Sequence, residues 1–452
     1  MPHLALILCC GFILWLWRKD MTWRKVGSRT LLIPAAWIVI QGSRPVSYWF
    51  GGGGGSDANP IDTFVFAMLI GSAVVVLVNR GMDWGGFLHN NKSICLIYAY
   101  LLLSVVWSEM PLVSLKRLFK DFGCVLVGLI LLTQTNPADA VRVMFVRVSY
   151  ILFPLSLVFI KYFPNIGRSF SRAGEAMFGG VTTQKNSLGE MVFVFSIMIL
   201  WDLIEVNKRE DRRGNKMQLV IRLGMLLMGV WLLITCDSQT SIFCLIVGAC
   251  ILWGTQRLLG MRNGRRVLIT ILTSVICLVV MDKTFGVSDM VIRALGRDPS
   301  LTGRTDIWKI LLEQKTDRFL GEGFYVFWDS PKGKAVIESF MKINSAHNGY
   351  LDLYVDGGLV GDALLVLVLL VAARRVVDRL FSGHPLSKVG LVYWLLAILY
   401  NFSESSFFRL DVLWFAFLLV TIEHPLMSQP TASKSGLREL RGTGAGYGDW
   451  AA

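Results

Sequence analysis

The sequence predicts an all-α polytopic integral membrane protein with about 11–13 transmembrane helices. Three observations lead to this fold class. Of the 452 residues, 54% are hydrophobic and only 17% are charged, whereas soluble proteins carry about 25% charged residues. Apolar runs recur along the whole chain at lengths that suit a bilayer. The formal net charge of +13 is carried largely by the segments between these runs. Cytoplasmic loops of membrane proteins have this bias, so the charge does not indicate nucleic acid as a partner.

The expected spans cover most of the chain. Several are shorter than the ~20 residues that cross a bilayer, which is why the expected number is a range. In chain order they are residues 3–17, 30–43, 61–79, 93–107, 117–133, 142–162, 187–205, 218–235, 240–256, 266–281, 348–372, 388–402 and 409–423. Charges follow the first span rather than precede it, which predicts a membrane helix and not a cleaved signal peptide.

Basic connecting segments predict the orientation. Counted along these spans, four segments rich in Lys and Arg fall on one side: 18–29, 207–216, 255–266 and 372–388. By the positive-inside rule this side is the cytoplasm. The loops at 51–55, 163–186 and 282–346 then face the opposite, non-cytoplasmic side.

This organisation predicts four parts of the chain. They are an N-terminal transmembrane bundle (1–281), a large outer loop with short amphipathic helices (282–347), the last three transmembrane helices (348–425) and a disordered cytoplasmic tail (426–452). Most of the eight cysteines lie inside apolar runs, which is typical of core residues rather than of a disulfide or zinc framework. No metal or other cofactor is expected.

One charged segment departs from the positive-inside rule. The sequence SLKRLFKD (114–121) places Arg117 and neighbouring charges at the expected outer end of a span. Charged groups at a membrane helix end are costly and often functional. Two interpretations remain open: long side chains that reach the lipid phosphates, and an electrostatic seat for an anionic lipid head group.

The loop at 167–190 offers a second anion site. Asn186 or Ser187 is expected to cap the following helix, with Lys185 beside its positive end. A helix start of this kind binds anions such as phosphate, although caps occur on every helix.

A similar arrangement recurs at residues 345–351. Ser345 is expected to cap a helix that enters the membrane from outside, with His347 in its first turn and Asn348 beside it. A helix start disfavours a charged imidazole, and a neutral one can accept a proton. His347 is therefore either a general base or a structural histidine bonded within the loop.

Two further charged residues are candidates. Arg304 lies in LTGRTDIW (301–308), where Thr305 or Asp306 is expected to cap a short amphipathic helix. Arg304 is either a surface partner of Asp306 or a planar fork for phosphate. Glu404, at an expected outer membrane boundary, is predicted to pair with the basic groups of these loops.

These stretches, in this order, resemble the signature of a known superfamily. They are WSEMPLVSLKR (107–117), GGVTTQKNSLG (179–189), LTGRTDIW (301–308), FLGEGFYVFW (319–328), AHNGYLDLYVDGGLVG (346–361) and NFSES (401–405). Over roughly residues 90–425, the chain resembles the bacterial O-antigen ligase and polysaccharide polymerase superfamily, especially its exopolysaccharide-polymerase branch. The block from 301 to 361 is the most specific part of this resemblance.

The resemblance implies a GT-C-like membrane glycosyltransferase. Such enzymes take a glycan from undecaprenyl diphosphate at the periplasmic face and join it to an acceptor glycan with inversion and without a metal. The resemblance therefore places the large outer loop (282–347) on the periplasmic side of a bacterial inner membrane. By resemblance, Arg304 would hold the diphosphate, and His347 would act on the acceptor hydroxyl or orient the leaving group. Lys185 and Asn186 match the Lys-Asn pair of the family. The residues expected to bind the diphosphate or the glycan are Lys185, Asn186, Arg117, Arg172, Asn348 and Glu404. A chain-length regulator and a flippase are the partners that such a role suggests.

The sequence leaves alternatives open. The residues of the motifs resemble a polymerase more than a ligase that transfers the glycan to lipid A–core. A transporter and an inactive scaffold are more remote alternatives. Relatives often carry Arg and His where this chain has Gly179 and Gln184. Either the site is rebuilt around Arg172 and Arg117, which would supply the missing charge, or the activity is altered.

Overall fold

The computed structural model describes residues 1–24, 28–52, 59–170, 174–207, 212–258, 304–314, 316–339 and 345–424, with a few positions between 264 and 273. The expected span 266–281 therefore lies largely outside the described residues, as do the expected tail at 426–452 and much of the expected loop at 282–347.

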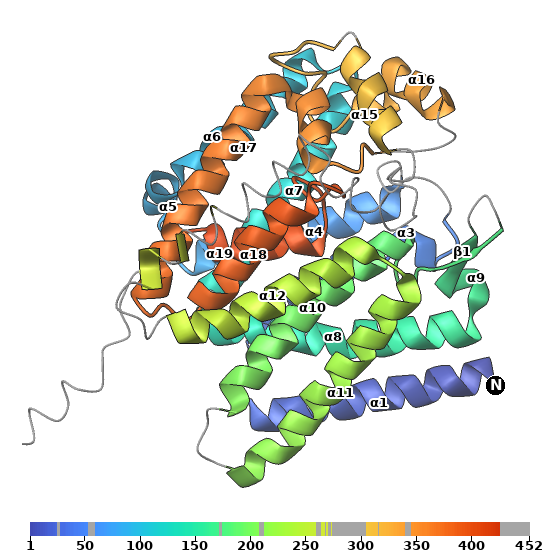
Figure 1. The fold of residues 1–452 in the computed structure, drawn as a ribbon, viewed down its shortest axis with the longest axis vertical. Coiled ribbons are helices and arrows are strands. Elements are labelled where there is room, and N and C mark those ends of the chain that lie inside the picture. Colours follow the sequence, from blue (N-terminus) through green and yellow to red (C-terminus); the bar gives the residue numbers. More distant parts are fainter. Residues whose placement is uncertain are drawn as a thin grey trace, which may run out of the picture.

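Helices make up nearly all of the described structure (Figure 1). They are α1 (Pro2–Trp23), α2 (Leu32–Gln41), α3 (Val46–Trp49), α4 (Pro60–Asn79), α5 (Trp84–Asn90), α6 (Lys92–Ser104), α7 (Pro111–Leu132), α8 (Pro137–Tyr162), α9 (Pro164–Gly167), α10 (Lys185–Asn207), α11 (Arg212–Cys236), α12 (Gln239–Leu258), α15 (Arg304–Glu313), α16 (Pro331–Ser339), α17 (Gly349–Phe381), α18 (Ser387–Tyr400) and α19 (Val412–Thr421). The strands β1 (Arg168–Phe170) and β2 (Ala176–Phe178) form an antiparallel hairpin.

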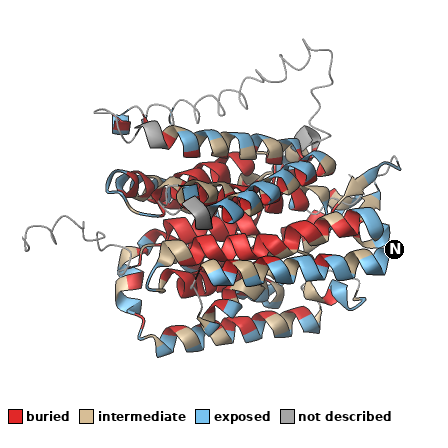
Figure 2. Cartoon of the chain, turned by 90° about the horizontal axis from the view of Figure 1, so that it is seen from below, coloured by how far each residue is buried: buried red, intermediate tan, exposed pale blue. Residues whose placement is uncertain are grey.

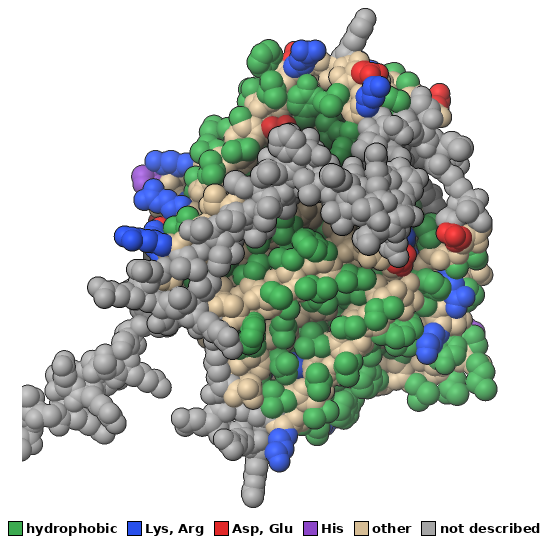
Figure 3. Space-filling model, viewed as in Figure 1, with side chains coloured by type: hydrophobic (Ala, Val, Ile, Leu, Met, Phe, Trp, Pro, Cys, Tyr) green, Lys and Arg blue, Asp and Glu red, His purple; other side chains and the backbone are tan. Residues whose placement is uncertain are grey.

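The fold class is confirmed as all-α and polytopic. Among the described residues, α4, α8, α10, α17 and residues 216–236 of α11 are long and apolar enough to cross a membrane. Shorter apolar helices accompany them, including α18 and α19. Apolar side chains cover much of the face shown in Figure 3, and blue Lys and Arg side chains lie mostly toward its margins. This distribution suits a protein surrounded by lipid.

The core lies where α7, α8, α10, α18 and α19 meet. All ten residues of α19 are buried, and α18 is buried from Ser387 to Tyr400 except for one intermediate position. Figure 2 shows these fully buried helices at the centre, with partly exposed helices around them. A helix that is apolar on every side belongs inside such a bundle. α1, by contrast, packs mainly on α8 and exposes most of its side chains.

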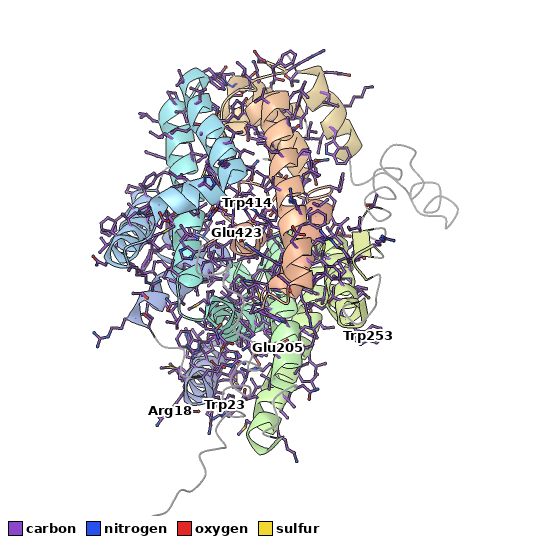
Figure 4. All side chains as sticks on the ribbon, turned by 90° about the vertical axis from the view of Figure 1, so that its left-hand side faces the viewer. Arg18, Trp23, Glu205, Trp253, Trp414 and Glu423 are labelled. Atoms are coloured by element: carbon purple, nitrogen blue, oxygen red, sulfur yellow. The ribbon has the colours of Figure 1, made fainter. Side chains whose placement is uncertain are left out.

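A buried ion cluster ties four helices together near the C-terminal end of α1. Asp20 accepts hydrogen bonds from Arg147 of α8 and Arg222 of α11, both at 2.8 Å. Asp202 of α10 accepts from Arg24 at 2.6 Å and from Arg222 at 2.9 Å. Figure 4 looks onto this end of α1, where Arg18, Trp23 and Glu205 are labelled. The cluster lies on the side for which the sequence predicts the cytoplasm.

The opposite end of the bundle carries the β1–β2 hairpin, and we call it the hairpin end. In Figure 1, β1, α3 and α9 lie on the right of the molecule, with α15 and α16 toward the upper right. The start of α10 follows the hairpin directly along the chain. The sequence predicts that this end faces the periplasm.

Helix α17 is broken near the hairpin end. Gly358 has φ 63° and ψ −168°, a conformation open to glycine but not to residues with a side chain. Such a break frees backbone groups, which need partners inside a membrane protein. The neighbouring loop provides them through four hydrogen bonds: Leu359 N to Arg318 O at 2.8 Å, Val360 N to Phe319 O at 3.2 Å, Glu322 N to Val355 O at 3.0 Å and Gly323 N to Asp356 O at 2.9 Å. The FLGEGF and YVDGGLVG stretches therefore form one interlocked unit.

Candidate active site

Three side chains from distant segments meet at the hairpin end. His347 Nδ1 lies 3.0 Å from Glu404 Oε2, and Asn186 Nδ2 donates to Glu404 Oε1 at 2.8 Å. One carboxylate therefore holds both partners. If Nδ1 carries the proton that it shares with Glu404, Nε2 keeps its lone pair and can accept a proton. Glu404 thus has His347 among its partners, in line with the sequence prediction, and also the neutral amide of Asn186.

The start of α17 fixes this histidine. Asn348 is the N-cap, with its side-chain oxygen accepting from Tyr350 N and Leu351 N at 3.1 Å each. The expected cap, Ser345, was therefore wrong, and His347 precedes the helix instead of lying in its first turn. His347 has φ 48°, a costly backbone conformation for a residue with a side chain. Asn348, expected to contact the glycan, uses its side-chain oxygen as the cap.

The loop that carries Glu404 packs directly on this helix start. Gly349 N donates to Asn401 O at 2.9 Å and to Glu404 O at 3.0 Å. A Cβ atom at position 349 would lie only 1.9 Å from Asn401 Oδ1. A glycine at this position therefore allows the two motifs, AHNG and NFSES, to come into contact.

His347 and Glu404 line a polar pocket of about 200 Å³. Its other lining residues are Thr183, Gln184, Asn186, Ser187, Glu190, Tyr325, Ser345, Tyr400, Ser405 and Arg409. A second, amphipathic pocket of about 260 Å³ is lined by charged groups and by apolar side chains such as Ile40, Phe66 and Met191. The two pockets share Thr183, Ser187, Glu190, Tyr325 and Arg409. A ligand could therefore occupy both.

Three cationic side chains line the amphipathic pocket: Arg117, Lys120 and Arg409. Arg117 forms an ion pair with Asp329 at 2.6 Å, and its guanidinium lies 4.6 Å from the centre of the Tyr325 ring. The Arg409 guanidinium lies 3.6 Å from the same ring. Tyr325 has φ 55° and follows the loop 318–323, whose backbone forms hydrogen bonds with α17 at its break. The loop that repairs the helix break thus also places the aromatic ring that contacts two arginines.

The carboxylate of Asp352 links Arg409 to several neighbouring segments. It accepts from Trp328 Nε1 at 2.8 Å, from Ala346 N at 3.0 Å and from Ser405 Oγ. It also lies 3.4 Å from Arg409. Burial alone would lower the pKa of Arg409. The Tyr325 phenol and the nearby carboxylates, Asp352 first, hold that pKa above its ordinary value. Arg409 is therefore a permanent cation.

Two carboxyl groups, those of Asp411 and Glu190, line the amphipathic pocket together with Arg409. Asp411 caps α19 by accepting from Trp414 N at 3.0 Å, and it also accepts from Ser406 Oγ at 3.1 Å. Glu190 of α10 interacts electrostatically with Asp411. Burial raises the pKa of Asp411 to about 7.

The next predicted residues lie around the start of α10. Helix α10 begins at Lys185, so Asn186 and Ser187 lie in its first turn and not at its cap. The polar pocket is lined by Gln184 and Asn186, on either side of Lys185. Gln184, one of the two departures from the family pattern, therefore lies within the site. Gly179, the other, forms a turn in which its N–H donates to Gly167 O at 3.0 Å.

Arg304 is the first residue of α15, so the expected caps Thr305 and Asp306 lie inside the helix. One turn later, Trp308 Nε1 donates to Ala346 O at 2.8 Å. Position 304 is thus on a helix anchored to the residue before His347. Arg172 lies outside the described residues.

Sequence reasoning missed Arg409, Tyr325 and the Glu190–Asp411 pair. Arg409 stood at the start of the expected span 409–423. A charge at a membrane helix end is the same signal that drew attention to Arg117. The structure shortens this span, because α19 begins only at Val412.

Comparison with known proteins shows what this chain is similar to. Residues 223–366 match the O-antigen ligase family, and this segment includes Tyr325 and His347 but not Glu404 or Arg409. The chain is also similar to the exopolysaccharide production protein ExoQ of Rhizobium meliloti (strain 1021). The two chains are 26% identical over 351 residues, which cover 74% of this chain and 76% of ExoQ. These two similarities confirm the resemblance stated from the motifs.

Proposed function

We propose that this protein is a glycan polymerase of exopolysaccharide biosynthesis. It joins oligosaccharide repeat units linked to undecaprenyl diphosphate at the periplasmic face of the bacterial inner membrane. The observation that supports this most is the pairing of His347 with Glu404 in a polar pocket that opens onto a cationic, amphipathic one. This arrangement suits a sugar acceptor on one side and a lipid-linked diphosphate on the other.

His347 acts as the general base in this mechanism. The acceptor hydroxyl donates its proton to Nε2 as its oxygen forms a bond to the anomeric carbon of the donor sugar. Glu404 keeps the ring oriented and stabilises the imidazolium that results, as a carboxylate does in hydrolase triads. Asn186 holds the second carboxylate oxygen and so keeps Glu404 in place.

The diphosphate leaves with the electron pair of the broken C–O bond. Positive groups fixed in advance stabilise the charge that develops on it. Arg117 and Lys120 in the amphipathic pocket are suited to this, and Arg304, on the helix anchored beside His347, would contribute from the other direction. Inversion requires the acceptor and the diphosphate on opposite faces of the anomeric carbon, which two pockets with a shared wall allow. Apolar residues such as Phe66 suit the start of the lipid chain.

A ligase that transfers the glycan to lipid A–core is the second candidate. The match of residues 223–366 to the O-antigen ligase family favours it, whereas the similarity to a protein of exopolysaccharide production favours the polymerase. A transporter has less support, because transporters place their polar sites near the bilayer midplane. Here the candidate site lies at one end of the bundle. A chain-length regulator and a flippase are the partners that the polymerase would need.

Deletion and complementation in the native host test the proposal. The deletion strain receives the wild-type gene, His347→Ala, Glu404→Gln or, as a matched control, His89→Ala. His89 is exposed on α5, away from both pockets. For a polymerase, the deletion removes high-molecular-weight exopolysaccharide and single lipid-linked units accumulate. Only the wild type and the control then restore polymer.

Other outcomes separate the alternatives. Loss of long-chain lipopolysaccharide, with polymer accumulating on the lipid carrier, identifies a ligase. If neither glycan changes in the deletion strain, the protein is not a polymerase or ligase of these glycans.

A further inference from the structure

We infer that Arg409, in the loop between α18 and α19, is a principal binding group for the diphosphate of the lipid-linked substrate. It would hold this group at the junction of the two pockets. The inference rests on the proposed function, because it names the residue that receives the diphosphate which that function requires.

The position of Arg409 is the first argument. Arg409 lines both the polar and the amphipathic pocket. The bond that breaks in the proposed reaction joins a sugar to a diphosphate, so it must lie where the sugar pocket meets the lipid pocket. Among the cationic residues described, Arg409 is the one that lines both pockets, since Arg117 and Lys120 line only the amphipathic one.

The second argument is that Arg409 is held in place before any ligand arrives. Its guanidinium lies 3.6 Å from the centre of the Tyr325 ring and 3.4 Å from Asp352, and its side chain is 12% exposed. The backbone of its loop is fixed by Arg409 N donating to Ser406 O at 3.2 Å and by Asp411 N donating to Arg409 O at 2.8 Å. A charge fixed in this way stabilises an anion without reorganising during the reaction.

The third argument is that the donors of Arg409 are not saturated. Charge-assisted hydrogen bonds between Arg and carboxylate are usually about 2.7–2.9 Å long, so the 3.4 Å separation from Asp352 is a loose pair. Among the described residues, Asp352 and the Tyr325 ring are the direct contacts of its side chain, and Asp356 and Asp411 interact with it at longer range. A guanidinium has five N–H donors in a planar fork that matches two phosphate oxygens. Arg117, in contrast, has a direct 2.6 Å pair with Asp329.

The surroundings of Arg409 select the ligand class. The amphipathic pocket combines its cations with Ile40, Phe66 and Phe408, so it suits an anion attached to a hydrocarbon chain. The polar pocket beside it has space and hydrogen-bonding groups for a sugar. A polyprenyl diphosphate fits this combination better than a free phosphate, which would leave the apolar wall uncovered.

Binding by the purified full-length protein in lipid nanodiscs tests the assignment. The probe is geranylgeranyl diphosphate, with geranylgeraniol and inorganic pyrophosphate as comparisons. The variants are Arg409→Gln, which removes the charge, and Arg409→Lys, which keeps the charge but loses the fork. Arg318→Gln is the matched control, because Arg318 is exposed in a neighbouring loop and lines neither pocket.

We expect Arg409→Gln to weaken binding of geranylgeranyl diphosphate about 10- to 100-fold, as for loss of a hydrogen bond to a charged group. Arg409→Lys should be intermediate, and Arg318→Gln should bind like the wild type. Pyrophosphate should bind more weakly than the lipid diphosphate, and geranylgeraniol should be insensitive to residue 409. Tighter binding of pyrophosphate than of the lipid probe would overturn the assignment of ligand class.

The controls separate failure of this inference from failure of the proposed function. If the wild type does not bind the diphosphate lipid, the proposed function is contradicted, because the enzyme would not bind its donor substrate. If the wild type binds it and Arg409→Gln binds it equally well, only the role of Arg409 is refuted. Should Arg409→Gln fail to fold, Arg409→Lys decides the question. Wild-type affinity in a folded Lys variant would contradict bidentate recognition by Arg409.

Discussion

Glu404 holds the imidazole of His347 at 3.0 Å across 57 residues of chain. The bond joins the loop before α17 to the loop after α18, and each loop is fixed by its own backbone contacts. Gly349 N, two residues after His347, donates to Glu404 O at 3.0 Å. The ring and its carboxylate are therefore held by both side-chain and main-chain bonds, as expected for a group that must present one nitrogen in a fixed direction.

Replacing Glu404 by Gln tests this relationship. Gln keeps the shape but can donate to Nδ1, which favours the tautomer that carries its proton on Nε2. We therefore expect polymer formation to fall by about 10²- to 10⁴-fold, measured with purified protein and lipid-linked oligosaccharide. Glu109→Gln, an exposed change in the loop before α7, is the control. Near wild-type turnover by the Glu404 variant would show that the pair is structural.

The contact between the two loops makes a second prediction. In Gly349→Ala, the new methyl group would lie 1.9 Å from Asn401 Oδ1, so the loop must move. Overpacking of this kind typically costs about 1–3 kcal/mol. We expect a lower Tm and reduced activity, by thermal unfolding in detergent and by the polymer assay. Gly71→Ala in α4 has open space around its Cβ and should be neutral or slightly stabilising. Equal Tm values for the two variants would refute this packing argument.

The sequence was enough to predict the fold class and the position of most helices, because a bilayer demands apolar segments of a minimum length. It could not predict the break in α17. Gly357 and Gly358 form a glycine pair in a largely apolar helix, and the break becomes tolerable only because residues 318–323 supply hydrogen-bond partners. Such a partner is a tertiary feature with no local signal. For the same reason, the span expected at 409–423 included three residues that belong to a loop.

For the candidate site, the sequence indicated individual residues but not which of them lie close together. His347, Asn186 and Glu404 were each singled out for a local reason, and the structure brings them into one cluster. Arg409 and Tyr325 were missed, because an arginine beside an apolar run and an aromatic in a loop carry weak signals by themselves. The contact between Arg409 and the Tyr325 ring forms only in the folded structure, where the segment after residues 318–323 packs against the loop before α19.

The buried ion cluster near the end of α1 leads to a third prediction. Arg222 is fully buried and pairs with both Asp20 and Asp202. Its removal leaves buried carboxylates with fewer partners, which typically costs about 3–5 kcal/mol. We expect Arg222→Leu to lower the Tm strongly, whereas Arg374→Leu, an exposed arginine on α17, should change it little. A small effect in both variants would mean that the cluster does not stabilise the bundle.

The Asp411 carboxyl leads to a prediction about pH. Burial raises its pKa from the ordinary value of 3.8 to about 7 in the folded protein. The folded state therefore holds this proton more tightly than the unfolded chain does. Its contribution to stability is complete below the ordinary pKa and is lost as the pH rises through about 7. The groups that face Asp411 are Glu190 from α10, Asp121 from α7 and Arg409 from its own loop.

Asp411→Asn isolates this effect, because Asn also caps helices well and carries no titratable proton. We expect the Tm of the wild type in detergent to decrease between pH 5 and pH 8, in the range set by the raised pKa. The decrease should be smaller in the Asn variant, and Asp317→Asn, in an exposed turn, should follow the wild type. A wild-type Tm that rises over this range, or an Asn variant with an unchanged slope, would show that Asp411 is ionised in the folded protein.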